Sequence, residues 1–224
     1  MSVGLVGSEM CIRDSSNIGY TYRIPTYTDL FYSSPTTLGN ENLKLEKALT
    51  KEFGLKYLKN NFNLSMSLYQ RDASDIIDYV KNNEAEPWQA SNIREIITNG
   101  FELSMGYKFY LGAFRPQSIN IGYSNINDDL LETDFAFSRY ALNSLKNQIT
   151  ATYMFEVNEK ISSTLSYKNA ERVVEEKYTV IDFKTIYKLE KFTLSLTLKN
   201  ILDTKYSETN LVPMPGFNSL VGIK

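Results

Sequence analysis

The sequence predicts an all-β fold, a transmembrane antiparallel β-barrel of which this chain supplies about ten strands as an open or incomplete wall. After residue 15, apolar and polar side chains alternate along most of the chain. Short and long connections also alternate between the segments that carry this pattern. The 224 residues include 16 Tyr and 12 Phe but a single Trp, a mixture that favours strands.

Composition excludes several other classes of protein. No stretch approaches the roughly 18 consecutive apolar residues of a transmembrane helix, whereas a barrel strand needs only about 10 of alternating polarity. The 24 basic and 26 acidic residues are scattered, so nucleic acid is not an expected partner. The absence of His removes the usual general base and the commonest transition-metal ligand. We therefore expect no enzyme, no metal site and no cofactor.

Residues 1–15 differ from the rest of the chain. They lack the period-two pattern, and they lack the basic and long apolar regions of a signal peptide. Cys11 is the sole cysteine and has no internal disulfide partner. The string GSEMCIRDS resembles translated adapter sequence. We expect residues 1–15 to be a non-native or disordered leader, with a natural disordered terminus as the alternative, and residues 16–224 to form the barrel portion.

The strands follow from the alternation, taken in chain order. In 61–80, Phe62, Leu64 and Met66 lie on one face and Asn63 and Ser65 on the other, a period that no helix uses. The same pattern recurs in FELSMGYKF, SINIGYS, QITATYMF, KISSTLSYK, VIDFKTIYK and FTLSLTLK. The expected strands are 16–24, 46–58, 61–80, 92–110, 117–128, 141–157, 159–172, 177–189, 191–200 and 214–224.

The connections are short and long in turn. Tight turns are expected around Asn60, Pro116, Asn158 and Glu190, and long polar loops at 25–45, 81–91, 128–140, 172–177 and 201–213. Outer-membrane barrels have this asymmetry, with short periplasmic turns and longer extracellular loops. Plugged outer-membrane transporters have about 22 strands, so ten strands supply a little under half of such a wall.

Aromatic residues gather at the strand ends beside the short turns and share the parity of the apolar face. This placement predicts an aromatic girdle at one membrane interface, although a soluble β-sandwich also alternates and also favours Tyr and Phe. Alternating loop lengths and long strands favour the barrel. The girdle residues are Tyr57, Phe62, Phe109, Phe155, Tyr187 and Phe192.

Two segments resemble TonB-dependent receptors. In Gly19–Ala48 the matching positions are Arg23, Pro25, Thr26, Thr28, Asp29 and Leu30, then Gly39, Asn40, Leu43, Lys44 and Glu46; Leu45 stands where the family usually has Pro. In Leu198–Phe217 they are Asn200, Asp203, Tyr206, Pro215 and Gly216. The family's last strand usually ends in an aromatic residue, whereas this chain ends at Lys224. We therefore expect a C-terminal barrel portion that is cut short at both ends.

The resemblance implies energy-coupled import of a scarce nutrient across the outer membrane of a Gram-negative bacterium. The ending Val-Pro-Met-Pro-Gly resembles the cobalamin receptor branch, while siderophore receptors share the same barrel end. The implied partners are outer-membrane lipid, the nutrient, an N-terminal plug domain and, through that plug, the TonB complex; this chain would supply only wall and loops. A passive porin-like barrel is the alternative function.

Candidate site residues lie in the loops. Tyr27, Phe31, Tyr32 and Trp88 offer aromatic surfaces for a ligand, with loop packing or headgroup anchoring as the alternative. The motif residues Arg23, Pro25, Asp29, Asn200, Asp203, Tyr206, Pro215 and Gly216 are interpreted as structural, because turns require such residues. The acidic residues Asp128, Asp129, Glu132 and Asp134 match no defined calcium loop. The charges of Arg71, Glu102, Lys108, Asp182, Lys184 and Lys199 are expected to face the lumen.

Overall fold

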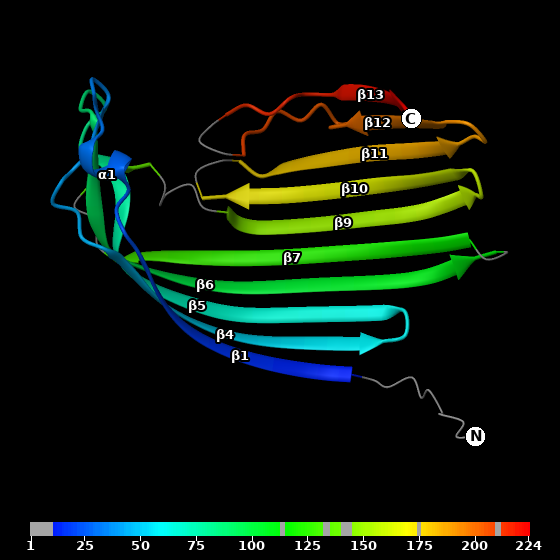
Figure 1. Cartoon of the computed structure of the whole chain (residues 1–224), viewed down its shortest axis with the longest axis horizontal. Coiled ribbons are helices and arrows are strands. Elements are labelled where there is room, and N and C mark those ends of the chain that lie inside the picture. The colour runs from blue at the N-terminus through cyan, green and yellow to red at the C-terminus, as the bar shows by residue number, and fades with distance from the viewer. Residues whose placement is uncertain (1–10, 113–114, 132–134, 140–144, 174–175, 209–211) are drawn as a thin grey trace.

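A single sheet contains every strand of the computed structural model, which describes residues 11–112, 115–131, 135–139, 145–173, 176–208 and 212–224. Ten long strands lie in the order β1-β4-β5-β6-β7-β9-β10-β11-β12-β13, each antiparallel to the next (Figure 1). Their bounds are β1 Cys11–Arg23, β4 Glu46–Lys59, β5 Phe62–Lys81, β6 Trp88–Leu111, β7 Arg115–Leu131, β9 Leu145–Asn158, β10 Ile161–Arg172, β11 Tyr178–Lys188, β12 Thr193–Lys199 and β13 Asn218–Ile223. The predicted all-β wall of about ten strands is confirmed.

The remaining elements are short and lie at one end of the sheet. They are the helix α1 (Tyr27–Phe31) and the strands β2 (Ser33–Ser34), β3 (Thr37–Leu38) and β8 (Phe137–Ser138). β3 pairs with β6, and β8 with β5. In the part of the chain that the structure describes, no helix is both long and apolar enough to cross a membrane.

The first strand begins earlier than predicted. Residues 11–15 extend β1 and pair in register with residues 54–58 of β4, so the expectation of disorder is wrong for them. Strands pair through their backbone N–H and C=O groups. Residues 11–15 can therefore pair with the otherwise exposed edge of β4 even though their side chains lack the alternating pattern. Residues 1–10 lie outside the described residues, and the non-native origin of the leader stays a prediction.

The connections alternate in length as predicted. Those that join β4 to β5, β9 to β10 and β11 to β12 are the short segments 60–61, 159–160 and 189–192. Asn60 has a left-handed φ of 48°, and the Asn158 side chain accepts hydrogen bonds from the backbone N–H groups of Lys160 and Ile161. Figure 1 shows these turns at one end and α1 with the longer connections at the other. We call these the turn end and the loop end.

The register divides the sheet into two faces. Leu64, Met105, Ile121 and Ala151 follow one another across β5, β6, β7 and β9 on the apolar face. The neighbouring positions Asn63, Gly106, Asn120 and Thr152 form a polar face. The charges expected to share the lumen side all have this second parity: Arg71, Glu102, Lys108, Asp182, Lys184 and Lys199.

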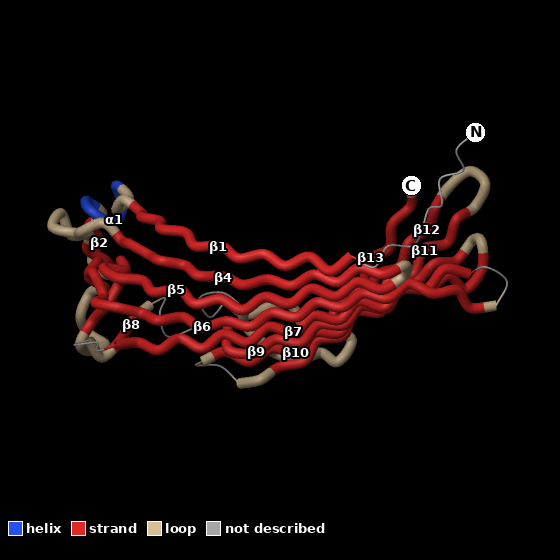
Figure 2. Tube along the Cα trace, turned by 90° about the horizontal axis from the view of Figure 1, so that it is seen from below, coloured by secondary structure: helices blue, strands red, loops and turns tan. Residues whose placement is uncertain are grey.

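The predicted girdle residues lie at the turn end and on the apolar face. The ring centroids of Tyr57 and Phe62 are 5.9 Å apart, and those of Tyr153 and Phe155 are 5.0 Å apart. Figure 2 shows one curved layer of strands rather than two packed sheets. A sandwich buries one sheet against another, so the arrangement of the described strands favours the barrel wall over the sandwich.

Gly100 provides a test of close packing on the polar face. A Cβ atom added to Gly100 would lie 2.0 Å from Cζ of Tyr69, whose ring lies over this glycine. We expect Gly100→Val to displace the ring and lower the free energy of unfolding by about 2 kcal/mol, measured by urea titration in detergent micelles.

Gly19→Val is the matched control, because nothing lies within 4 Å of an added Cβ there. It should change the free energy of unfolding by less than about 0.5 kcal/mol. In a Tyr69→Ala background the cost of Gly100→Val should also vanish. An undiminished cost in that background would contradict the assignment to ring displacement.

Candidate functional site

The loop that joins β1 to β4 is fastened to the sheet by an ion-pair network. Arg23 ends β1, and its Nε and Nη2 atoms each lie 2.7 Å from a carboxylate oxygen of Glu46, the first residue of β4. Its Nη1 atom lies 3.3 Å from Oδ2 of Asp29. A two-point contact between a guanidinium and a carboxylate fixes the relative orientation of the two groups and also brings their opposite charges together. We call Arg23, Asp29 and Glu46 the clasp.

Asp29 also organises the helix α1. Its carboxylate accepts the backbone N–H of Thr26 at 2.9 Å, while the Thr26 hydroxyl accepts the backbone N–H of Asp29 at 3.1 Å, which is a capping box. The hydroxyl of Tyr79, on β5, donates to Oδ1 of Asp29 at 3.1 Å. Asp29 is 7% exposed, so its contacts are shielded from water. Pro25 stands directly before Thr26, outside the helix.

The clasp carries a pH dependence. Burial raises the pKa of Asp29, but the hydrogen bonds from Thr26 and Tyr79 and the charge of Arg23 outweigh it, so the pKa falls below its ordinary value of 3.8. The stability that Asp29 contributes is therefore complete above about pH 5 and is lost as the pH falls below about 4. We expect backbone amides of residues 26–31 to exchange faster with solvent at pH 3 than at pH 6, beyond the intrinsic effect of pH. Asp29→Asn should remove that excess, and a retained excess would exclude Asp29 as its source.

A second set of contacts holds the rest of this loop against β6. A Cβ at Gly39 would lie 2.8 Å from the carbonyl of Leu30, so the backbone passes where only glycine fits. The Asn40 amide donates to the carbonyl of Ala90 at 3.1 Å. The Asn92 side chain accepts the backbone N–H of Lys44 at 2.8 Å. Asn40 and Lys44 therefore hold the loop against β6, and Gly39 allows the loop backbone to pass close to Leu30.

The predicted ligand-facing aromatics fall into two groups. The rings of Tyr27 and Phe31 on α1 lie 5.0 Å apart and are 79% and 49% exposed, and Tyr32 follows as the exposed C-cap. Trp88 belongs to another cluster, because Lys81 Nζ lies 4.8 Å from its ring and 5.6 Å from the ring of Phe137. Ligand binding by any of them stays a prediction.

Asn200 lies at the centre of the contacts made by the second motif segment, Leu198–Phe217. It is 2% exposed and has a left-handed φ of 50°. Its backbone N–H donates to Asp182 at 2.7 Å, and its amide nitrogen donates to the carbonyls of Thr204 and Pro215 at 2.9 and 3.1 Å. Its amide oxygen accepts the N–H of Thr204 at 2.9 Å. The backbone N–H of Asn200 thus ties it to β11, and its side chain ties the following turn to the segment that leads into β13.

The other residues of this motif surround Asn200. Asp203 Oδ1 accepts the backbone N–H of Phe217 at 2.8 Å, and a Cβ on Gly216 would lie 2.4 Å from the same oxygen. Tyr206 stacks on Tyr178 with ring centroids 4.6 Å apart. Each of these contacts joins parts of the chain to one another, in keeping with the structural interpretation of the motif.

Some structural residues carried no signal in the sequence. Asp78, 1% exposed, accepts hydrogen bonds from the Ser138 hydroxyl and from the backbone N–H of Tyr79. Ser138 is 60 residues away, and such pairings depend on strand register rather than on local pattern. Thr26-x-x-Asp29, by contrast, has the spacing of a capping box and was a usable signal for α1.

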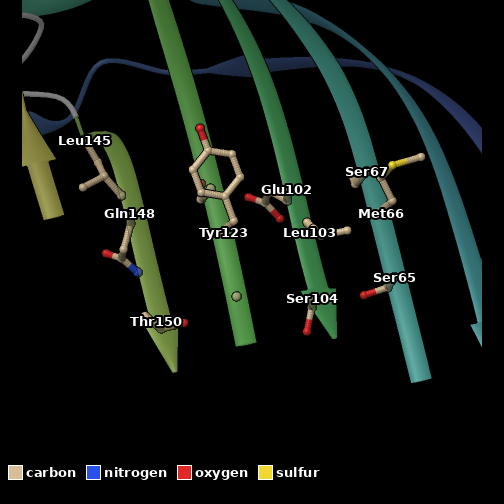
Figure 3. A pocket seen from close by; sticks show the side chains of 12 residues that line it. Ser65, Met66, Ser67, Glu102, Leu103, Ser104, Tyr123, Leu145, Gln148 and Thr150 are labelled. Carbon is tan, nitrogen blue, oxygen red and sulfur yellow. The ribbon is translucent and has the colours of Figure 1, made fainter. Parts of the chain in front are cut away.

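The polar face is hollowed at its middle. The hollow has a volume of about 370 Å³ and lies across β5, β6, β7 and β9 (Figure 3). Small hydroxyl side chains and one carboxylate line much of it, among them Ser65, Ser67, Glu102, Ser104, Ser124 and Thr150. Met66, Leu103, Tyr123 and Leu145 also line it, so this open hollow offers a mixed polar and apolar surface to water or to another segment.

The acidic residues near the β7–β9 connection do not gather in the described structure. Asp128 accepts the Thr98 hydroxyl at 2.6 Å, and Asp129 accepts the Asn127 amide at 3.3 Å. Glu132 and Asp134 lie outside the described residues. Within the ranges that the structure describes, no three His, Cys, Asp or Glu side chains lie close enough to hold a metal ion.

Comparison with protein families shows which family this sheet belongs to. Residues 15–201 match the family described as "TonB dependent receptor-like, beta-barrel". The chain belongs to this family. Its members are receptors and transporters rather than enzymes, and their barrels lie in the outer membrane of Gram-negative bacteria.

Individual relatives agree with the family. The Vitamin B12 transporter BtuB of Vibrio vulnificus (strain YJ016) is 23% identical over 198 residues, which are 85% of this chain and 30% of that protein. The copper transporter OprC superposes with a TM-score of 0.70 at 17% identity, over 95% of this chain and 36% of its own. The siderophore receptor PirA from Acinetobacter baumannii gives 0.69 at 14%, over 95% and 38%. The chain thus spans about a third of the length of these relatives.

Proposed function

We propose that residues 16–224 form the C-terminal part of the barrel of an outer-membrane receptor that imports a scarce nutrient, cobalamin or a metal chelate such as a siderophore, with energy from TonB. The observation that carries the proposal is the family match over residues 15–201. The two-faced sheet, with tight turns at one end and long connections at the other, is the wall that such a receptor needs.

In this proposal the apolar face meets lipid and the polar face meets the lumen. A plug encoded upstream would lie against the polar hollow and would carry the contact with TonB. The chain itself contributes wall and the loop-end aromatics Tyr27, Phe31 and Tyr32. Cobalamin is the first cargo to test, because the BtuB sequence matches 85% of this chain.

The experiment is uptake by cells that express the protein that contains this chain. We expect radiolabelled cyanocobalamin or a ferric siderophore to accumulate in cells with TonB and not in cells without it. Equal accumulation in both would contradict energy coupling and favour a passive porin-like barrel. An upstream reading frame without a plug would contradict the receptor assignment.

The behaviour of the isolated 224-residue chain tests the membrane-facing wall. We expect it to aggregate in buffer without detergent, because it exposes both an apolar face and the unpaired edges of β1 and β13. A folded monomer in plain buffer would show that the apolar face does not require lipid.

A further inference from the structure

Four exposed lysines lie near the short turns on the polar face of the sheet. Lys56 is three residues before the end of β4, and Lys108 is three residues before the end of β6. Lys184 and Lys188 lie within the last five residues of β11. The strand register places all four on the polar face. We call Lys56, Lys108, Lys184 and Lys188 the lysine row.

The lysine row lies at the depth of the girdle but on the opposite face. Lys56 directly precedes the girdle residue Tyr57, and Lys108 directly precedes the girdle residue Phe109. Successive side chains of a strand point to opposite faces, so the lysines lie on the face that does not carry the aromatic rings. The sheet itself therefore separates the lysine row from a lipid headgroup on the girdle side.

The lysine row makes no ion pair within the part of the chain that the structure describes. The ion pairs found there all lie in the half of the sheet nearer the loop end, and their cations are Arg23, Lys51, Lys146 and Lys168. Two carboxylates share the polar face near the row, those of Glu156 and Asp182. Asp182 instead accepts the backbone N–H of Asn200 at 2.7 Å. Four lysines beside two carboxylates give this surface a net positive charge.

The lysine row is too wide for one small anion. Lys108 and Lys184 occupy the same line of the register, and the three residues between them are Ser118, Met154 and Thr164. Neighbouring strands lie about 4.8 Å apart, so the four steps from β6 to β11 span about 19 Å. A carboxylate contacts an ammonium group at about 2.8 Å and would reach one of these two lysines at a time. The spacing therefore fits an extended acidic surface.

We propose that the lysine row is a docking surface for an acidic face of the plug. This inference rests on the proposed function, which places a plug against the polar face. The chain covers 30% of the BtuB relative and 36% of OprC, so most of each relative lies outside the region that it matches. The wall's own ion pairs neutralise cations nearer the loop end, whereas Asp and Glu side chains of the plug neutralise the lysine row at the turn end.

Zero-length cross-linking of the whole protein in its membrane tests this contact directly. A carbodiimide joins an amine to a carboxylate only where the two groups already touch, and mass spectrometry identifies the joined peptides. We expect amide links between the lysine row and Asp or Glu residues of the part of the protein that precedes residue 16. Links from the row to Glu156 or Asp182 alone, or no links at all, would overturn the proposal.

Charge reversal provides a second measurement. Lys108→Glu combined with Lys184→Glu should make the plug leave the barrel at a lower urea concentration, detected as ion conductance across a planar bilayer. The difference from the unsubstituted protein should shrink as salt rises from about 0.1 to 1 M, because the Debye length falls from about 10 to 3 Å. Lys59→Glu is the matched control, since Lys59 lies at the same end of the sheet but pairs with Phe62 on the girdle face. It should leave the urea concentration unchanged.

The outcomes separate this inference from the proposed function. An equal effect of Lys59→Glu, or a shift that salt does not reduce, would exclude the lysine row as the docking surface. TonB-dependent uptake without the expected cross-links would contradict this inference and leave the importer supported. Cross-links to the upstream part, together with uptake that does not need TonB, would support the acidic contact and contradict the importer.

Discussion

Replacing Asn200 by Ala is expected to lower the free energy of unfolding by about 3 kcal/mol, measured by urea titration in detergent micelles. The substitution removes three hydrogen bonds of a side chain that is 2% exposed and leaves the carbonyls of Thr204 and Pro215 without their donor. Ala also tolerates the left-handed φ of 50° poorly, which adds about 1 kcal/mol.

Two variants separate these contributions. Asn60 has a similar φ of 48° but is exposed in a tight turn, so Asn60→Ala should show the backbone cost alone, about 1 kcal/mol. Asn200→Gly should relieve the backbone cost and retain the loss of hydrogen bonds. If Asn200→Ala costs no more than Asn60→Ala, the side-chain contacts of Asn200 contribute nothing to stability.

The strands were predictable because alternation is a direct consequence of the pleat. A segment such as Phe62–Leu68 has one arrangement that places every apolar side chain on one face, so pattern alone specifies both the element and its orientation. The turns beside Asn60 and Asn158 were predictable for a related reason, since Asn tolerates the left-handed region and accepts hydrogen bonds from nearby backbone N–H groups.

The extension of β6 was not predictable from pattern. Trp88–Ser91 was expected to be loop, yet these residues pair with Asp78–Val80 of β5 and with β3. Their strand conformation depends on partners supplied by other segments, one of them 51 residues away. Local propensity carries no information about such partners.

The candidate site, like the fold, could be predicted from the sequence only in part. The motif positions Arg23, Asp29 and Asn200 were found because they resemble family segments, and the turn-forming side chains explain why they recur at strand ends. Their contacts were not found. Tyr79 lies near the end of a strand pattern, and only the register of β5 brings its hydroxyl to Asp29, 50 residues earlier.

Replacing Arg23 by Met is expected to lower the free energy of unfolding of the loop end by about 2 kcal/mol. The substitution leaves the carboxylates of Asp29 and Glu46, whose side chains are 10% and 14% exposed, near each other without their shared cation. Hydrogen exchange of residues 26–31 and of Ile77 should therefore accelerate, because the backbone N–H of Ile77 donates to Glu46.

Lys51→Met is the matched control for this change, since Lys51 and Asp72 form an ion pair between β4 and β5 with side chains 49% and 38% exposed. Water already solvates that pair, so its loss should cost less than about 0.5 kcal/mol. Glu46→Gln in the Arg23→Met background should recover part of the lost stability by removing one of the two facing charges. If the double variant is no more stable than Arg23→Met, repulsion between the carboxylates is not the cause, and the loss belongs to the missing hydrogen bonds of the guanidinium alone.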